Sequence, residues 1–110
     1  MHPRRGEVWW VSFDPSVGGE IQKTRPAIVI SNDAANIALN RVIVVPISSQ
    51  VTKLYPSEAL VTVRGQQSKA LADQVTTASK VRFKTKLSAL SASDMAAVEN
   101  VVAFQLGLRR

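Results

Sequence analysis

Short apolar segments separated by turn-forming residues are the feature that most restricts the fold of this chain. Turn signals such as Asp14-Pro15-Ser16 and Tyr55-Pro56-Ser57 lie between stretches rich in Val, Ile and Ala. Segments of this length and spacing favour β-strands over amphipathic helices. The pattern predicts a small antiparallel β-barrel or sandwich whose strands span residues 7–13, 26–31, 41–47, 59–63 and 70–77. Apolar residues on both faces of the first strand predict that it is buried on both sides.

Three further segments have patterns of their own. Residues 32–40 fit a polar loop or one helical turn, and residues 64–67 fit a turn. Residues 80–87 alternate strictly between cationic and uncharged side chains. An extended backbone would place Val81, Phe83 and Leu87 on one face and four cations on the other: Lys80, Arg82, Lys84 and Lys86. Such a segment suits either a cationic binding face or a solvated edge strand.

A helix is predicted near the C-terminus. Ser91 and Asp94 have the spacing of a capping box, with Asp in place of the usual Glu, and Leu90 and Met95 have the spacing of a hydrophobic staple. Gly107 is the expected stop. We expect an apolar stripe to pack on the barrel or on a partner helix, as core and not as a cofactor site: Met95, Val98, Val101, Val102 and Leu106.

The charge balance favours a polyanionic partner. The chain has 110 residues, enough for a single domain over residues 1–110, and its 14 Lys and Arg against 8 Asp and Glu give a net charge of +6. A small basic domain typically binds nucleic acid more often than a membrane surface. The alternative is a charge that serves solubility alone.

Several chemistries are excluded by composition. The chain contains no cysteine, which excludes disulfides, thiolate metal sites and cysteine nucleophiles. Its one histidine, His2, lies next to the start, so we expect neither a histidine pair nor a histidine-ligated metal, and no cofactor. No apolar run approaches the roughly 20 residues of a membrane span. Residues 1–5 lead into no signal-type apolar region, and we expect a cytoplasmic protein.

One arginine stands at the start of an apolar strand. Pro26 biases Arg25 towards an extended backbone, so Arg25 lies where a loop becomes a strand, at the rim of the core. The next apolar strand ends in the hydroxyl residues Ser48 and Ser49. A guanidinium presents five donors in a rigid fork, which suits a phosphate that gains charge during a reaction.

Four blocks in this order resemble one family. They comprise residues 6–9 with 13–15, residues 18–20 with 25–31, residues 45–50, and residues 70–75. Together they are similar to the MazF/PemK toxins of bacterial toxin–antitoxin pairs. The resemblance implies an SH3-like β-barrel of the CcdB/PemK type with a C-terminal helix, assembled as a homodimer.

The resemblance also implies an activity and a partner. It implies a metal-independent endoribonuclease that cuts single-stranded RNA at short sequences and so inhibits translation and growth. The products would carry 2′,3′-cyclic phosphate and 5′-hydroxyl ends. A cognate antitoxin with an acidic, partly disordered C-terminal segment would block the RNA groove. No membrane is implied as a partner.

Three residues match the family's catalytic positions. Arg25 and Ser48 match the catalytic pair, and Glu20 matches an acidic residue of the site, although many relatives carry Thr in place of Ser48. Without cysteine or a histidine pair, the substrate's own 2′-OH must act as nucleophile. Arg25 then suits the role of phosphate clamp, Ser48 that of a second donor, and Glu20 that of proton acceptor.

Each assignment has a structural alternative. Arg25 would then only pair with Asp14, Glu20 or Asp33. Glu20 would be a solvated loop residue and Ser48 a turn residue. Ser48 and Ser49 are adjacent on a strand, so only one of them can point at Arg25.

A wider set of residues is predicted to bind RNA through loops and cations. Trp9 and Trp10 alternate in direction, so one could stack on a base, but core packing is the favoured interpretation for both. The predicted RNA-binding residues are Gly18, Gly19, Lys23, Thr24, Ser49, Gln50, Lys53, Lys69, Asp73, Gln74, Lys80, Arg82, Lys84 and Lys86.

Two other functions fit the same pattern. A CcdB-like gyrase poison shares the implied fold and acts by binding protein, and a non-catalytic barrel would bind nucleic acid only. Neither function needs the Arg25/Ser48 pair, which favours the nuclease.

Overall fold

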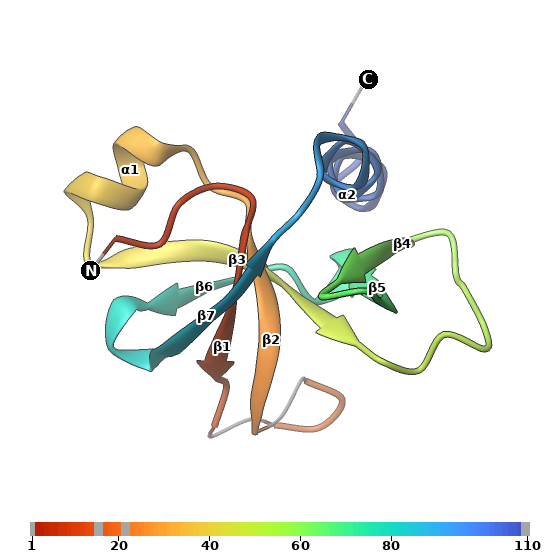
Figure 1. Ribbon diagram of the computed structural model, residues 1–110, viewed down its shortest axis with the longest axis horizontal. Coiled ribbons are helices and arrows are strands. Elements are labelled where there is room, and N and C mark those ends of the chain that lie inside the picture. Colours follow the sequence, from red (N-terminus) through yellow and green to blue (C-terminus); the bar gives the residue numbers. More distant parts are fainter. Residues whose placement is uncertain (1, 15–16, 21–22, 109–110) are drawn as a thin grey trace.

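A curled antiparallel sheet with one long helix against it forms the molecule (Figure 1). The computed structural model describes residues 2–14, 17–20 and 23–108. The strands are β1 (Glu7–Ser12), β2 (Thr24–Val29), β3 (Arg41–Ser48), β4 (Glu58–Val63), β5 (Gln66–Leu71), β6 (Thr76–Ser79) and β7 (Phe83–Ala89). The helices are α1 (Asp33–Ala38) and α2 (Ala92–Gln105), with 3₁₀ turns η1 (Ala72–Gln74) and η2 (Lys80–Arg82). The prediction of a mainly β fold with a C-terminal helix is confirmed, and the sheet is a half-barrel.

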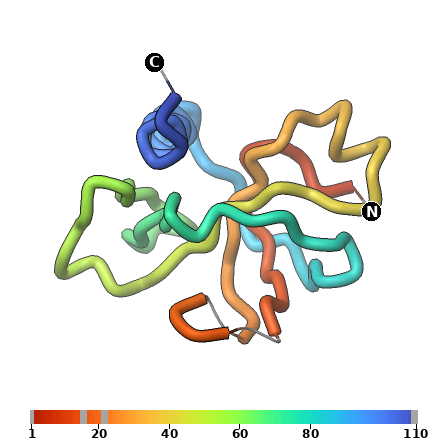
Figure 2. Tube along the Cα trace, turned by 180° about the vertical axis from the view of Figure 1, so that it is seen from behind, coloured from red at the N-terminus to blue at the C-terminus, as the bar shows by residue number. Residues whose placement is uncertain are grey.

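Strand β3 joins the two parts of the sheet. The strand order is β4-β5-β3-β2-β1-β7, and β6 also pairs with β3. The ladder of β3 with β2 ends at the pair Ala27 and Pro46, and β3 then pairs with β5 through Ile47 and Ser48. The sheet therefore divides after Pro46. Seen from behind, α2 and the β4–β5 hairpin lie on one side, and α1 and β6 lie on the other (Figure 2).

Apolar side chains fill both faces of the sheet, as the sequence predicts for the first strand. Trp9 packs edge-on against Phe83, with ring centroids 5.8 Å apart. The first cluster lies under α2 and contains Val8, Ile28, Val45, Ile47, Val61, Val63, Ala70, Met95 and Val98. The second contains Trp9, Val11, Ala27, Val29, Val42, Val44, Ala78 and Phe83. Burial of these side chains is the main favourable contribution to folding.

Helix α2 begins and ends as the sequence predicts. The Ser91 hydroxyl accepts a hydrogen bond from the Asp94 amide at 3.1 Å, and Gly107 has a φ of 71°. Met95 is buried in the first cluster. The Asp94 carboxylate accepts from the Thr62 amide at 2.8 Å, so it ties α2 to β4. The predicted stripe is too long, because Leu106 is the C-cap residue and is 54% exposed.

The predicted strand over residues 70–77 is wrong. Strand β5 begins earlier, at Gln66, and the 3₁₀ turn η1 separates it from β6. The turn predicted over residues 64–67 contains only Arg64 and Gly65, whose φ values are 51° and 79°. A two-residue turn with both φ values positive matches the twist of a hairpin, so the strands pair up to its edges.

The alternating segment 80–87 is not extended throughout. Residues 80–82 form η2, and the Ser79 hydroxyl accepts from the Val81 amide at 3.4 Å. Val81 is 84% exposed instead of lying beside Phe83. The extended part, β7, lies at the end of the strand order and matches the solvated edge strand.

Candidate active site

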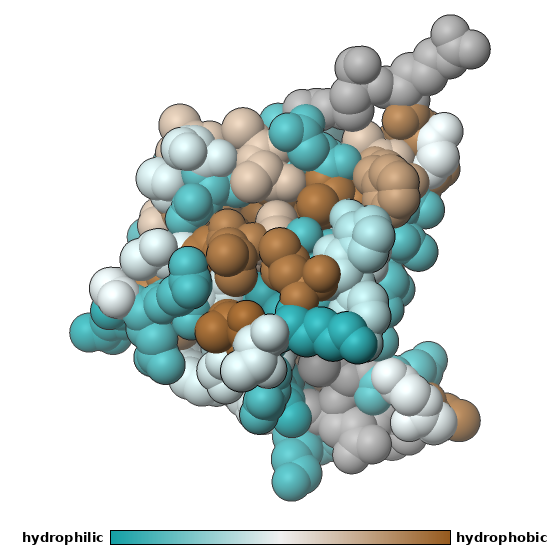
Figure 3. All heavy atoms as spheres, turned by 90° about the vertical axis from the view of Figure 1, so that its right-hand side faces the viewer, coloured by the Kyte–Doolittle hydropathy of each residue, from teal (hydrophilic) through white to brown (hydrophobic). Residues whose placement is uncertain are grey.

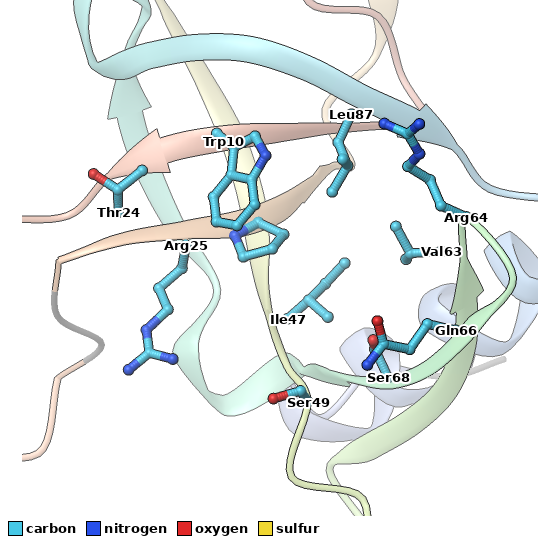
Figure 4. Close-up of a pocket in the computed structure, with 11 residues that line it drawn as sticks. Trp10, Thr24, Arg25, Ile47, Ser49, Val63, Arg64, Gln66, Ser68 and Leu87 are labelled. Carbon is cyan, nitrogen blue, oxygen red and sulfur yellow. The ribbon is translucent and has the colours of Figure 1, made fainter.

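A cavity of about 450 Å³ opens where β2 and β3 diverge (Figure 4). Its floor is apolar and comes from five strands, and its rim is polar and cationic. Arg25 lies at one end of the cavity and Arg64 at the other, with Trp10 and Ile47 between them. The lining residues are Trp10, Thr24, Arg25, Pro26, Ile47, Ser49, Val63, Arg64, Gln66, Ser68 and Leu87.

Arg25 lies at the rim because it stands directly before Pro26, where a loop becomes an apolar strand. It pairs with Val11 of β1 as the second residue of β2, and its side chain is exposed. The next residue, Pro26, is half-buried, and Ala27 is fully buried. The chain therefore passes from solvent into the core within three residues, and the guanidinium stays at the cavity mouth.

Ser48 and Ser49 take different directions. Ser49 lines the cavity with Arg25, whereas Ser48 is half-buried at the end of β3 and pairs with Lys69 of β5. The Ser48 hydroxyl accepts from the Gln50 amide at 3.1 Å. Extending the β2–β3 register by two residues would set Arg25 opposite Ser48, but β3 has changed partner there. Both serines thus lie at the fork, and of the two only Ser49 is among the residues that line the cavity.

Glu20 lies in the β1–β2 loop, residues 13–23. Its carboxylate accepts a hydrogen bond from the Val17 amide at 2.6 Å, and its side chain is exposed. The Gly19 carbonyl accepts from the Gln74 amide group at 3.2 Å, which joins this loop to η1. Gly18 is exposed in the same loop, and Asp73 is exposed in η1. The structure therefore places Gly18, Gly19 and Glu20 in a loop that contacts Gln74 of η1, and Glu20 is not among the residues that line the cavity.

The base of this loop is held by Arg82. Its guanidinium donates to the Ser12 carbonyl at 3.0 Å and to the Asp14 carbonyl at 2.5 Å. Lys23 has a φ of 64°, and its amide donates to the Asp14 carboxylate at 2.9 Å. Arg82 thus holds the loop backbone through hydrogen bonds, and its side chain does not continue the row of lysines on β7.

The remaining predicted cations are spread over the surface. Lys84 and Lys86 are exposed on β7, and Lys80 is half-buried in η2. Lys86 pairs with Glu7 at 3.0 Å. Burial raises the pKa of Glu7, but hydrogen bonds from the Arg4 amide, Trp9 and Lys86 outweigh it, so the pKa lies below its usual value.

Lys69 is a buried lysine. Its ammonium lies 3.0 Å from the Glu58 carboxylate and donates to the Lys53 carbonyl at 2.9 Å. Both charged side chains are about nine-tenths buried. In the structure, Lys69 therefore faces the protein, while Lys53 and Gln50 belong to the loop that Lys69 holds.

Eight cavity residues were not predicted from the sequence as site residues, and four of them are polar or aromatic. Arg64, Gln66 and Ser68 come from the β4–β5 hairpin, and Trp10 is half-buried over the cavity instead of in the core. The alternation of Trp9 and Trp10 does indicate that one tryptophan faces away from its neighbour. No local sequence pattern indicates that the β4–β5 hairpin folds back against β2.

Neither a metal site nor a membrane-spanning helix is found within the described ranges. Among residues 2–14, 17–20 and 23–108, no group of three or more His, Cys, Asp or Glu side chains is placed to hold a metal ion. Within the same ranges, neither helix is long and apolar enough to cross a membrane.

Solved structures define the class of protein. The chain superimposes on MazF from Deinococcus radiodurans with a TM-score of 0.86 and 27% identity, covering 98% of this chain and 99% of that one. It superimposes on a MazE–MazF structure from the same organism with a TM-score of 0.78 and 29% identity, covering 99% and 100%. The fold is therefore that of the small β toxins with a C-terminal helix.

Sequence comparisons identify the family. Residues 4–106 match the model described as PemK-like, MazF-like toxin of type II toxin–antitoxin system. The chain is 36% identical to endoribonuclease MazF9 of Mycobacterium tuberculosis, covering 96% of this chain and 97% of the relative. It is 34% identical to endoribonuclease MazF of Staphylococcus epidermidis, covering 96% and 92%. The chain belongs to the PemK-like, MazF-like toxin family.

Proposed function

We propose that this protein is a sequence-specific, metal-independent endoribonuclease toxin that cleaves single-stranded RNA in the cytoplasm and so inhibits translation and growth. The observation that carries the proposal is the position of Arg25. It lies at the mouth of a cavity where β2 and β3 diverge, beside the strand end that carries Ser48 and Ser49. The names of the two relatives at 34–36% identity support an RNA-cleaving activity.

The chemistry proceeds by internal attack within the RNA. The 2′-oxygen bonds to the adjacent phosphorus, and the bond from phosphorus to the 5′-oxygen of the next nucleotide breaks. Glu20 accepts the 2′-OH proton, and the leaving oxygen takes a proton from solvent water to become a 5′-hydroxyl. Arg25 donates to the non-bridging oxygens, whose negative charge grows in the transition state. The other product end is a 2′,3′-cyclic phosphate.

Ser48 is the proposed second donor to the phosphate. Ser49 competes for this role, because it lines the cavity with Arg25. The variants Ser48→Ala and Ser49→Ala separate the two roles. We expect Ser48→Ala to lower kcat by roughly 10²-fold or more, as loss of a transition-state donor does. Ser49→Ala should then change KM more than kcat.

Partners follow from the family and from charge. The net charge of +6 favours both RNA and an acidic antitoxin segment that folds on binding. The related Deinococcus radiodurans structure holds MazE with MazF. We propose a homodimer that is neutralised by a cognate antitoxin of this kind.

Incubation of the purified protein with single-stranded RNA in excess EDTA tests the function. We expect cleavage with cyclic phosphate ends, and a loss of roughly 10²-fold or more in Arg25→Ala. The matched control is Arg41→Ala, an exposed cation at the start of β3 outside the predicted RNA-binding set, with circular dichroism to confirm folding of both variants. Intact RNA together with blocked DNA supercoiling would instead identify a gyrase poison. Binding without cleavage would identify a non-catalytic barrel.

A further inference from the structure

The β3–β4 loop, residues 49–57, is fastened from below by a buried ion pair. The Lys69 ammonium lies 3.0 Å from Glu58 and donates to the Lys53 carbonyl at 2.9 Å. The same Glu58 oxygen accepts from the Tyr55 amide at 2.9 Å. One buried pair therefore fixes the loop backbone at two residues, Lys53 and Tyr55.

Two backbone hydrogen bonds complete this attachment. The Glu58 amide donates to the Tyr55 carbonyl at 2.9 Å, and the Ala72 amide donates to the Ser57 carbonyl at 3.1 Å. A loop held at several backbone groups loses little further entropy when a ligand binds to it. Its side chains are thus presented in a preformed arrangement.

Tyr55 is the aromatic side chain that this loop presents. It is 50% exposed, and its ring centroid lies 5.1 Å from the Lys53 ammonium and 5.8 Å from that of Lys69. On the face that carries the β4–β5 hairpin, apolar side chains gather in the middle and hydrophilic ones surround them (Figure 3). Exposed apolar side chains of this region include Leu54, Tyr55 and Leu60.

The loop lies next to the proposed catalytic strand end. It begins at Ser49, directly after Ser48, and Ser48 pairs with Lys69 across β3 and β5. The Lys69 ammonium in turn lies over the Tyr55 ring, 5.8 Å from its centroid. A strand of RNA whose scissile phosphate is at Arg25 and Ser48 therefore has the Tyr55 ring beside its path.

We propose that Tyr55 and Lys53 form a nucleotide subsite, in which one RNA base stacks on the Tyr55 ring and Lys53 contacts the neighbouring phosphate. Lys69 and Glu58 are positioning residues for this subsite. The proposal rests on the proposed function and adds a specific contact beyond the cleavage centre. Stacking on an aromatic ring is sequence-tolerant, so the subsite contributes affinity more than base choice.

The first test compares Tyr55→Ala with Tyr55→Phe, which keeps the ring. The binding probe is an RNA oligonucleotide with the mapped cleavage sequence and 2′-deoxyribose at the attacking sugar. We expect Tyr55→Ala to raise Kd and KM about 10- to 100-fold with kcat within about twofold, and Tyr55→Phe to behave as the parent does. Unchanged Kd in Tyr55→Ala, or a loss confined to kcat, would overturn the proposal.

The second test uses the fact that the chain has one tyrosine. Incorporation of 3-fluorotyrosine gives one fluorine resonance from Tyr55 without any substitution. We expect this resonance to shift when the same oligonucleotide is titrated. A shift with an acidic antitoxin peptide alone, and none with RNA, would overturn the proposal. Absence of RNA cleavage by the parent protein would overturn the proposed function, and a fluorine titration with an unstructured single-stranded RNA of mixed sequence would then still report on the subsite.

The positioning role is tested by Lys69→Met with Lys69→Arg as the conservative variant. We expect Lys69→Met to raise KM as Tyr55→Ala does, and the double variant to be no worse than either single change. Lys69→Arg should restore KM, because a guanidinium still reaches carboxylate and carbonyl. Additive losses in the double variant would show that Lys69 acts independently of Tyr55. If Lys69→Met fails to fold, Lys69→Arg and the fluorine resonance carry the test.

Discussion

Two loops border the proposed site, and they are held in different ways. In the β1–β2 loop, the described contacts are mainly exposed hydrogen bonds, such as Val17 to Glu20 and Lys23 to Asp14. In the β3–β4 loop, the contacts converge on a buried pair, Lys69 with Glu58. Exposed polar contacts contribute little free energy each, whereas breaking a buried pair is costly.

Because they are held differently, we expect the two loops to contact RNA in different ways. Each exposed hydrogen bond described for the loop with Glu20 is one that RNA can replace at low cost in free energy. The loop with Tyr55 is held firmly, so its contacts with RNA exist before binding. A nuclease that reads single-stranded RNA gains from both, because preorganised contacts supply affinity and adjustable ones complete the site after binding.

The largest expected effect comes from Glu58→Ala. This change leaves the Lys69 ammonium buried without its carboxylate, and we expect the free energy of unfolding to fall by about 3–5 kcal/mol. Urea denaturation measures the loss. The matched control is Glu99→Ala, whose partner Arg5 is about one-third exposed, with an expected loss below about 1 kcal/mol. Equal losses would show that the buried pair stabilises the fold no more than an exposed pair, and the β3–β4 loop would then not be firmly held.

A smaller effect is expected for Arg82→Ala. This change removes two hydrogen bonds from a charged donor to the Ser12 and Asp14 carbonyls. We expect the free energy of unfolding to fall by about 1–2 kcal/mol, measured by urea denaturation. Lys84→Ala on the same edge of the sheet should change it by less than about 0.5 kcal/mol. A loss in Arg82→Ala as large as that in Glu58→Ala would mean that the β1–β2 loop is held equally firmly.

Salt dependence gives a third comparison of the loops. If Lys53 contacts an RNA phosphate, Lys53→Ala should lower the slope of log Kobs against log salt concentration by about 1. Lys23→Ala should reveal whether the β1–β2 loop contributes a similar contact. Fluorescence anisotropy with the non-cleavable oligonucleotide measures both slopes. An unchanged slope in Lys53→Ala would exclude the phosphate contact from that loop.

The smallest effect is expected at Glu7, which belongs to neither loop. Its pKa lies below its usual value of 4.5 in the folded protein, so its ionised form stabilises the fold above that pH and the contribution is lost as the pH falls through the lower folded value. Glu7→Gln should cost less than about 1 kcal/mol at neutral pH and flatten the decline of stability below pH 4.5. Thermal melts between pH 7 and pH 3 measure this. A decline as steep as that of the parent would assign it to other carboxylates.

Local patterns predicted much of this molecule. The dipeptide Arg25-Pro26 places a cation at a strand entrance from backbone sterics alone. Ser91 caps α2 as its spacing indicates. The short apolar runs place β1, β2, β3 and β4 within two residues of their observed bounds. These features depend on residues that are adjacent in the sequence, so the sequence alone can predict them.

Features that depend on distant partners were missed. Lys69 resembles any surface lysine, because its partner Glu58 lies eleven residues away and the burial arises only when β4 and β5 pair. The η1 turn was not predicted, because the apolar residues on either side of it fit one continuous strand. Arg64 and Trp10 meet one cavity only because the hairpin lies against the fork.

Two prolines stand where β2 and β3 part. The last rung of their ladder joins Ala27 to Pro46, and the next position on β2 is Pro26. Pro26 stands at the next position that would donate to β3 and has no N–H group, so the ladder loses a donor where it ends. An incoming nucleotide therefore meets an entrance whose strands have already parted.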